Sequence, residues 1–304
     1  MVFFSQDDET IMRGTARGYL LVAAAAGLWG TLGLIFRILH DDYGLSALAI
    51  AFLRAALAFT LLALFLLFTR PQRLRLDPRA LPFFALFGFC GVTAFYFSYT
   101  QAVIATTVTT AVVLLYTAPA FVTLIARRVW GEPLGARKMS ALVLAFAGCA
   151  LVARAYDPAQ VSLNLIGLAV GLAAGFTYAL YTVFSKFALE RFASSTALTY
   201  ALFFGALFLI PSQTLDDFAP LVRGPGVWVF LLLLVIGPTL GSLALYNAGL
   251  LRVPASNASL VANIEPVVAS LLAFTFLGER LELLQMVGGA MVIAGAVWLS
   301  AGKS

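Results

Sequence analysis

Charge is scarce in this chain. Only 11% of its residues are Asp, Glu, Lys or Arg, whereas 62% are hydrophobic and the mean hydropathy is +0.98. Soluble domains carry about 25% charged residues, so the composition excludes a soluble fold and leaves a membrane protein. The pI of 9.4 would favour a nucleic-acid partner in a soluble protein. Here the basic residues stand in short loops between apolar runs, where they set orientation, so no nucleic acid is expected.

Residues that could carry catalysis or bind a metal are also sparse. His40 is the only histidine, and the chain has no His-Glu-x-x-His, no Gly-x-Ser-x-Gly and no pair of aspartates inside an apolar run. Cys90 and Cys149 both lie in apolar runs, where free cysteine behaves as a small hydrophobe. The sequence therefore argues against an enzyme and predicts neither a metal site nor a cofactor.

What the chain has in abundance is long apolar runs. A spanning helix needs about 20 mostly apolar residues, and this rule predicts an all-α membrane protein with ten spans. Residues 1–17 are then a cytoplasmic tail and residues 155–161 a periplasmic linker. The approximate limits of the spans are 18–39, 45–68, 81–104, 106–126, 138–153, 163–186, 195–210, 226–250, 255–277 and 281–301.

The second half of the chain repeats the first. Residues 99–151 align with residues 246–298 without a gap, at a constant shift of 147. Five spans is an odd number, so the second copy must enter from the opposite face. We therefore predict two inverted five-helix repeats, residues 18–154 and 162–304, around a central cavity, an arrangement typical of alternating-access transport. Matched pairs include Tyr99 with Tyr246, Pro119 with Pro266, Gly131 with Gly278, Glu132 with Glu279, Leu134 with Leu281 and Gly148 with Gly295.

The repeat also resolves the least marked span boundary. Residues 81–126 carry no charge, so the third and fourth spans run together in the sequence. Thr107 aligns with Pro254, which ends any continuous helix, and a tight turn is therefore predicted at residues 105–107. With the N-terminus taken as cytoplasmic, most lysines and arginines fall on the inner side.

These features, in this order, resemble the drug/metabolite transporter superfamily, EamA type. A Gly-Glu pair follows the fourth span of each half, Arg54 lies in the second span, and Glu265 precedes Pro266 in the ninth. The tyrosines within the spans make the chain most similar to YddG-type bacterial exporters of aromatic and other amino acids. The resemblance covers residues 18–301. It implies a multi-pass exporter of the bacterial inner membrane, with both termini cytoplasmic, a small-molecule substrate and a monomeric state.

Polar and aromatic residues inside the spans are the candidate substrate contacts. A tyrosine in mid-membrane needs a partner for its hydroxyl, and a wet cavity supplies one. Packing between helices is the alternative for each of them. Asn263 and Tyr116 rank first, because the repeat places them on matching faces. The predicted cavity residues are Trp29, Tyr96, Tyr99, Tyr116, Phe176, Tyr178, Tyr181, Tyr246, Asn247, Ser259 and Asn263.

Two prolines and two charges lie deep in the spans. Pro119 and Pro266 each remove a backbone hydrogen bond, so they should kink their helices and serve as hinges or as ordinary bends. Arg54 and Glu265 lie at similar depth, where isolated charges are unfavourable, and an ion pair or nearby partners are expected. Glu265 should face neighbouring helices, opposite Asn263; if it faces water instead, it becomes the candidate coupling protonation site.

The glutamates of the two Gly-Glu pairs, Glu132 and Glu279, are expected to fix the turn into the next helix. Alternatives to an amphipathic-solute exporter remain open. A transporter of nucleotide sugars or phosphorylated metabolites should place several basic residues centrally, and only Arg54 is there. A polytopic enzyme lacks a catalytic constellation, and a channel lacks a ring of charges or a filter loop. Neutral or zwitterionic cargo therefore fits best.

Overall fold

The computed structural model describes residues 6–222, 224–278 and 280–301, with side chains described from Gly14 onward. The described chain is helical and has no strand, which confirms the all-α class. Long apolar helices are expected here, because a chain in lipid must satisfy its backbone hydrogen bonds internally. The α-helices are α1 (Gln6–Gly30), α2 (Leu32–Arg37), α3 (Ala47–Thr69), α4 (Leu81–Gly88), α5 (Ala94–Ala105), α6 (Val108–Leu115), α7 (Ala118–Trp130), α8 (Ala136–Val152), α9 (Leu165–Leu189), α10 (Ser194–Leu209), α11 (Gly226–Val235), α12 (Ser242–Leu250), α13 (Ala255–Ala262), α14 (Glu265–Leu277) and α15 (Leu283–Ser300).

Several α-helices join into longer rods that could cross a bilayer. Within the described ranges, nine helical segments are long and apolar enough to do so. α8, with 17 residues, is slightly shorter than these. The nine segments are Gly14–Asp42, Ala47–Thr69, Pro78–Ala105, Val108–Trp130, Leu165–Leu189, Ser194–Ser212, Gly226–Leu250, Ala255–Leu277 and Leu283–Ser300.

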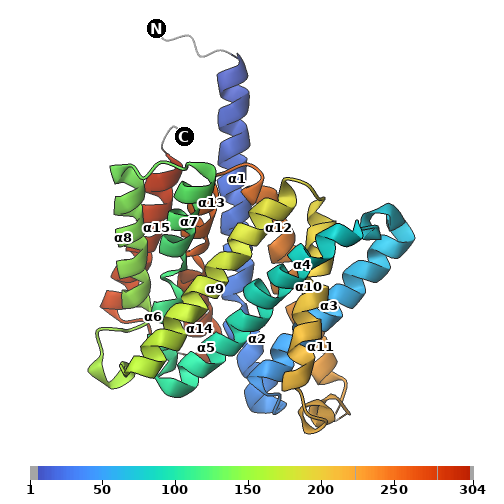
Figure 1. Ribbon diagram of the computed structural model, residues 1–304. Helices are drawn as coiled ribbons and strands as arrows, with labels where there is room; N and C mark the ends of the chain where they lie inside the picture. The colour runs from blue at the N-terminus through green and yellow to red at the C-terminus, as the bar shows by residue number, and fades with distance from the viewer. Residues whose placement is uncertain (1–5, 223, 279, 302–304) are drawn as a thin grey trace.

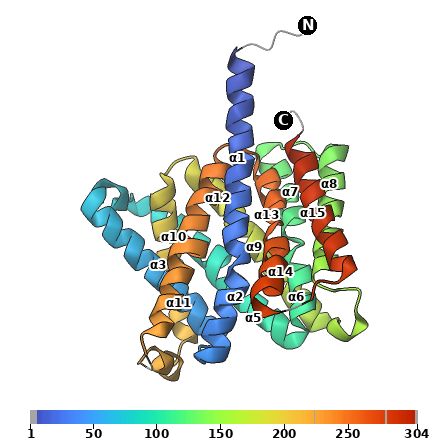
Figure 2. The same ribbon diagram turned by 180° about the vertical axis from the view of Figure 1, so that it is seen from behind.

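The rods form a bundle with α8 and α15 at one side and α3 and α11 at the other (Figures 1 and 2). The start of α1 and the end of α15 lie at the same end of the bundle. α8 packs along α15 through glycines: a Cβ atom built on Gly148 would lie 2.6 Å from the Gly288 carbonyl oxygen, and one on Gly288 would lie 2.6 Å from that of Gly148. Such small residues let membrane helices approach closely.

Two rods are broken at matching places. α6 and α7 are separated by Tyr116 and Thr117, and α13 and α14 by Asn263 and Ile264. Pro119 and Pro266 take the second position of the following helix in each case. The prolines thus lie just beyond the bends instead of at them, because a missing N–H is tolerated in a first helical turn but not in a helix interior.

Other paired features follow the same shift of 147. Gly131 and Gly278 end α7 and α14 with left-handed backbone, φ +67° and +66°. π-helical turns occupy Phe89–Thr93 and Ile236–Gly241, and each lies between two α-helices of one rod. The predicted turn at residues 105–107 is confirmed, because α5 ends at Ala105 and α6 begins at Val108.

Candidate functional site

A cavity of about 780 Å³ occupies the centre of the bundle. Helices of both halves of the chain line it, chiefly α1 to α3, α5 and α6 from the first half and α9 and α12 to α14 from the second. At one end its lining includes the exposed residues His40, Asp41 and Ile104. This open end lies away from the start of α1, because α2 and the end of α5 lie there (Figure 1).

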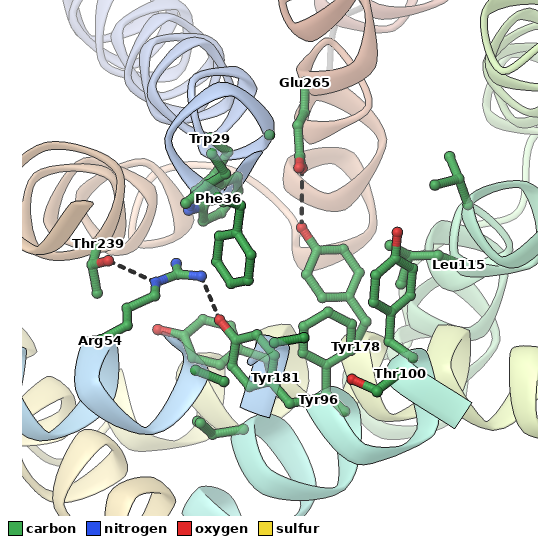
Figure 3. A pocket seen from close by; sticks show the side chains of 18 of the residues that line it. Trp29, Phe36, Arg54, Tyr96, Thr100, Leu115, Tyr178, Tyr181, Thr239 and Glu265 are labelled. Atoms are coloured by element: carbon green, nitrogen blue, oxygen red, sulfur yellow. Dashed lines mark hydrogen bonds between the residues drawn. The ribbon is translucent and has the colours of Figure 1, made fainter. Parts of the chain in front are cut away.

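Most of the predicted cavity residues line this space. They come from six rods, and Figure 3 shows Trp29, Tyr96, Tyr178 and Tyr181 converging on it. Neighbours that sequence reasoning missed include Phe95, which lies one helical turn before Tyr99. The predicted residues that line the cavity are Trp29, Tyr96, Tyr99, Tyr116, Tyr178, Tyr181, Tyr246 and Ser259.

Three predicted residues lie elsewhere. Phe176 is 41% exposed on the outer side of α9, with its ring edge-on to Phe121. Asn247 is buried and donates to the Ser194 hydroxyl at 3.2 Å. Asn263 is only 4% exposed and does not line the cavity, although the helices on either side of it, α13 and α14, do. The Asn247 amide thus joins α12 to the start of α10, outside the cavity.

Aromatic rings form most of the cavity wall. Trp29 and Tyr246 have ring centroids 5.1 Å apart, and the Tyr246 hydroxyl is 2.7 Å from that of Thr182. Phe95 packs on Tyr178, with centroids 5.1 Å apart. Such a wall suits a solute with an apolar or aromatic part.

Arg54 is held at the cavity by groups of neighbouring rods. Its Nε donates to the Thr239 hydroxyl at 2.7 Å, and one terminal nitrogen donates to the Tyr96 hydroxyl (Figure 3). The other donates to the Pro238 carbonyl at 3.3 Å. The carbonyl and the Thr239 hydroxyl both belong to the π-helical turn Ile236–Gly241, whose position no sequence signal indicated.

Glu265 also lines the cavity, at the first position of α14. The Tyr178 hydroxyl donates to its carboxylate at 3.4 Å (Figure 3). The expectation that Glu265 faces away from the cavity and Asn263 toward it was wrong. The helical angle between them was extrapolated through residues 263–264, where the helix is interrupted, so the steps of three and four residues no longer apply.

The ion pair proposed from the sequence is not formed. The ion pairs of the described residues do not include one between Arg54 and Glu265. Each charge instead has polar partners nearby, which was the alternative. In the broken rods, Pro119 and Pro266 cannot donate to the carbonyls of Leu115 and Ala262, two residues that line the cavity.

Among the described residues, no exposed one lines the other end of the cavity, and polar contacts join the two halves on that side of the bundle. Glu132 accepts hydrogen bonds from Ala255 N at 2.8 Å and Ser256 N at 3.4 Å, and from the Ser256 hydroxyl. Lys138 donates to Ser256 Oγ at 2.7 Å and lies 3.3 Å from Glu132. Glu132 thus reaches α8 through Lys138, but it also caps α13, which was not predicted. Glu279 lies outside the described residues.

Apolar membrane helices around an amphipathic cavity that is open at one end define a membrane transporter. The EamA-like transporter family model matches the chain over residues 16–154 and again over residues 165–301. The chain belongs to this family, and it is a multi-pass membrane protein. The family points to a transporter and not to an enzyme.

Several proteins similar in sequence to this chain are named as transporters. The chain is 29% identical to an uncharacterized transporter of Archaeoglobus fulgidus, over 92% of this chain and 95% of that one. It is 24% identical to the uncharacterized inner membrane transporter YicL of Salmonella typhimurium, over 95% and 97%. It is also 30% identical to a probable terminal-alkyne amino-acid exporter of Streptantibioticus cattleyicolor, over 90% and 89%. A crystal structure with 18% identity shares the fold, with a TM-score of 0.78 and coverage of 92% and 95%.

Proposed function

We propose that this protein exports small amphipathic solutes, foremost amino acids including aromatic ones, by alternating access. The observation that carries the proposal is the central cavity, which is bounded by both halves, open at one end and closed at the other. A site shared by two related halves, with access from one side at a time, is what rocking of the halves requires. One chain contains the whole cavity, which favours a monomer.

The proposed topology has ten spans in two inverted repeats. The start of α1 and the end of α15 lie at the same end of the bundle (Figures 1 and 2), and this arrangement requires an even number of membrane crossings. Adding α8 to the nine longer segments gives that number. The repeats are residues 18–154 and 162–304, with Pro119 and Pro266 beside their hinges. Both termini are then cytoplasmic in a bacterial inner membrane, and the cavity opens to the periplasm.

The cavity wall supports amino acids over phosphorylated cargo. Arg54 is the one basic side chain deep in the described cavity, whereas a phosphate site would need several. Arg37 and His40 lie only at the open end. The name of the Streptantibioticus relative, a probable amino-acid exporter, supports the same class.

Transport by purified protein in proteoliposomes tests the substrate class. We expect radiolabelled phenylalanine to exchange against internal phenylalanine, leucine or tyrosine, and not against a sugar phosphate of similar size. Empty liposomes are the control. Exchange of sugar phosphates without exchange of any amino acid would overturn the proposal in favour of the phosphorylated-metabolite alternative.

Cysteine labelling tests the sidedness. In a variant lacking Cys90 and Cys149, a cysteine at Thr100 lines the open cavity, whereas one at Ser185 is buried toward the closed end. A membrane-impermeant maleimide added from the periplasmic side should label Thr100→Cys much faster than Ser185→Cys. Faster labelling of Thr100→Cys from the cytoplasmic side would refute the orientation.

A further inference from the structure

The two deep charges of the cavity are held apart, each by its own partners. Arg54 is bound by Thr239, Tyr96 and Pro238, and Glu265 meets Tyr178. Figure 3 shows both side chains pointing into the same space from opposite sides, with Phe36 and Tyr178 beside it. The chain thus presents one basic and one acidic side chain to the same cavity, without an ion pair between them in the described residues.

Arg54 retains hydrogen-bonding capacity toward the cavity. A guanidinium has five N–H groups in a planar fork, and the three bonds to Thr239, Tyr96 and Pro238 use three of them. These bonds also fix the plane of the fork. A fixed guanidinium with free N–H groups is a strong receptor for a carboxylate.

The Glu265 carboxylate has unused hydrogen-bond acceptor capacity in the same cavity. Its Oε2 meets only the long hydrogen bond from Tyr178, and its Oε1 has no hydrogen-bond partner within the described ranges. An isolated charge at this depth is unfavourable unless a cation, a proton or water accompanies it. An ammonium group fits, because it supplies both the opposite charge and three donors.

We propose that Arg54 binds the carboxylate and Glu265 the ammonium group of one cargo molecule, so that the cavity selects zwitterions. This inference rests on the proposed function and assigns its specificity. The aromatic wall between the charges, which includes Tyr178 and Phe95, receives the apolar side chain of the cargo. Neither anchor alone distinguishes an amino acid from an organic anion or an organic cation. The two together do.

Competition against phenylalanine exchange in proteoliposomes tests the inference with three ligands of the same ring. Unlabelled phenylalanine carries both charged groups, phenethylamine lacks the carboxylate, and 3-phenylpropionate lacks the ammonium group. In the wild-type protein we expect the inhibition constant of each truncated ligand to be at least about tenfold higher than that of phenylalanine, because the truncated ligand leaves one buried charge unpaired. These wild-type ratios need no variant.

Two variants should then change the ratios in opposite ways. Glu265→Gln removes the partner of the ammonium group, so phenylalanine should lose its advantage over phenylpropionate and keep its advantage over phenethylamine. Arg54→Gln should do the reverse. Glu190→Gln removes a carboxylate that accepts from Trp130 outside the cavity and should leave both ratios unchanged. Where Arg54→Gln does not fold, Arg54→Lys keeps the charge and should keep the wild-type order.

The outcomes separate the two proposals. If the wild-type protein exchanges no amino acid, the proposed function fails and the zwitterion site fails with it. If amino acids exchange but a truncated ligand competes as well as phenylalanine, only the zwitterion site is overturned. The same holds if Glu265→Gln weakens all three ligands equally, because that would assign Glu265 a structural role alone.

Discussion

Two helix starts at matching positions of the repeat, one at each end of the cavity, are capped differently. α6 begins at Val108 and α13 at Ala255, positions related by the shift of 147. At the open end, Thr107 of the same rod caps α6, since its hydroxyl accepts from Thr110 N at 3.1 Å. At the closed end, the carboxylate of Glu132, from the other half, caps α13. A cap across the halves must break before this end can open, whereas a cap within one rod need not.

The lysine of the closed end also has no counterpart. Lys138 is 8% exposed and bridges Glu132 and Ser256, and the shift of 147 places the neutral Gln285 at the matching position. Gln285 Nε2 donates to the Val152 carbonyl instead, at 3.1 Å. The buried charged contact of the closed end is therefore replaced, at the position that matches Lys138, by a neutral hydrogen bond.

The largest effect should come from breaking the charged contact on one side only. Lys138→Met leaves the Glu132 carboxylate buried beside α13 with its cation removed, which we expect to destabilise the protein by about 3–5 kcal/mol. The double variant Glu132→Gln, Lys138→Met removes both charges and should be less destabilised than the single one. Thermal unfolding of the detergent-purified protein measures both. Equal unfolding temperatures for the single and double variants would refute the buried pair.

A smaller effect is expected from Ser256, which is fully buried between Glu132 and Lys138. Ser256→Ala removes one hydroxyl and leaves both charges paired, so the loss should be about 1–3 kcal/mol. Because the contact joins the halves, labelling of a cysteine at Ser185 should also become faster. Ser300→Ala is the control, since that hydroxyl bonds only within its own helix. No change in labelling would show that Ser256 does not hold the closed end.

At the open end, Asp217 gives a pH-dependent comparison. The Ser46 hydroxyl donates to it at 2.7 Å and Thr214 N at 2.8 Å, and these bonds lower the pKa of Asp217 below its ordinary value of 3.8. A lowered pKa means that the stabilisation is complete above pH 3.8 and is lost as pH falls through the folded-state pKa. Asp217→Asn should therefore lower the unfolding temperature at pH 7, and the difference from wild type should shrink below pH 3.8. A difference that grew on acidification would contradict this.

The smallest effect is expected from the ion pair between Arg154 and Glu282, whose side chains are 43% and 42% exposed. Exposed pairs contribute about 0–1 kcal/mol, because water screens them. Arg154→Gln should lower the unfolding temperature only slightly, close to the resolution of the measurement. Addition of salt should remove this shift. A loss of stability as large as that of Lys138→Met would contradict the expectation that the exposed ion pair contributes less than the buried one.

The repeat allowed much of the fold to be predicted. It located the turn at residues 105–107 and the paired helix ends at Gly131 and Gly278, because hydropathy and symmetry act on whole helices. It failed where the local backbone departs from a regular helix. Glu265 was predicted to face away from the cavity and Asn263 toward it, and the structure places them the other way because the helix is interrupted at residues 263–264.

Contacts between distant segments were also out of reach. Glu132 caps a helix 123 residues away, and neither a Gly-Glu pair nor helix periodicity indicates which helix start it will meet. Phe176 was placed in the cavity because it aligns with Trp29, but α9 turns that position outward. Symmetry in sequence thus predicts the position of an element better than it predicts the direction of a side chain.

The paired π-helical turns bear on the history of the chain. Phe89–Thr93 and Ile236–Gly241 begin at positions related by the shift that relates the two halves. A π turn corresponds to one additional residue in a helix. On the proposed duplication, a single insertion inherited by both copies explains the two turns with one event instead of two. On that proposal, the insertion is older than the duplication.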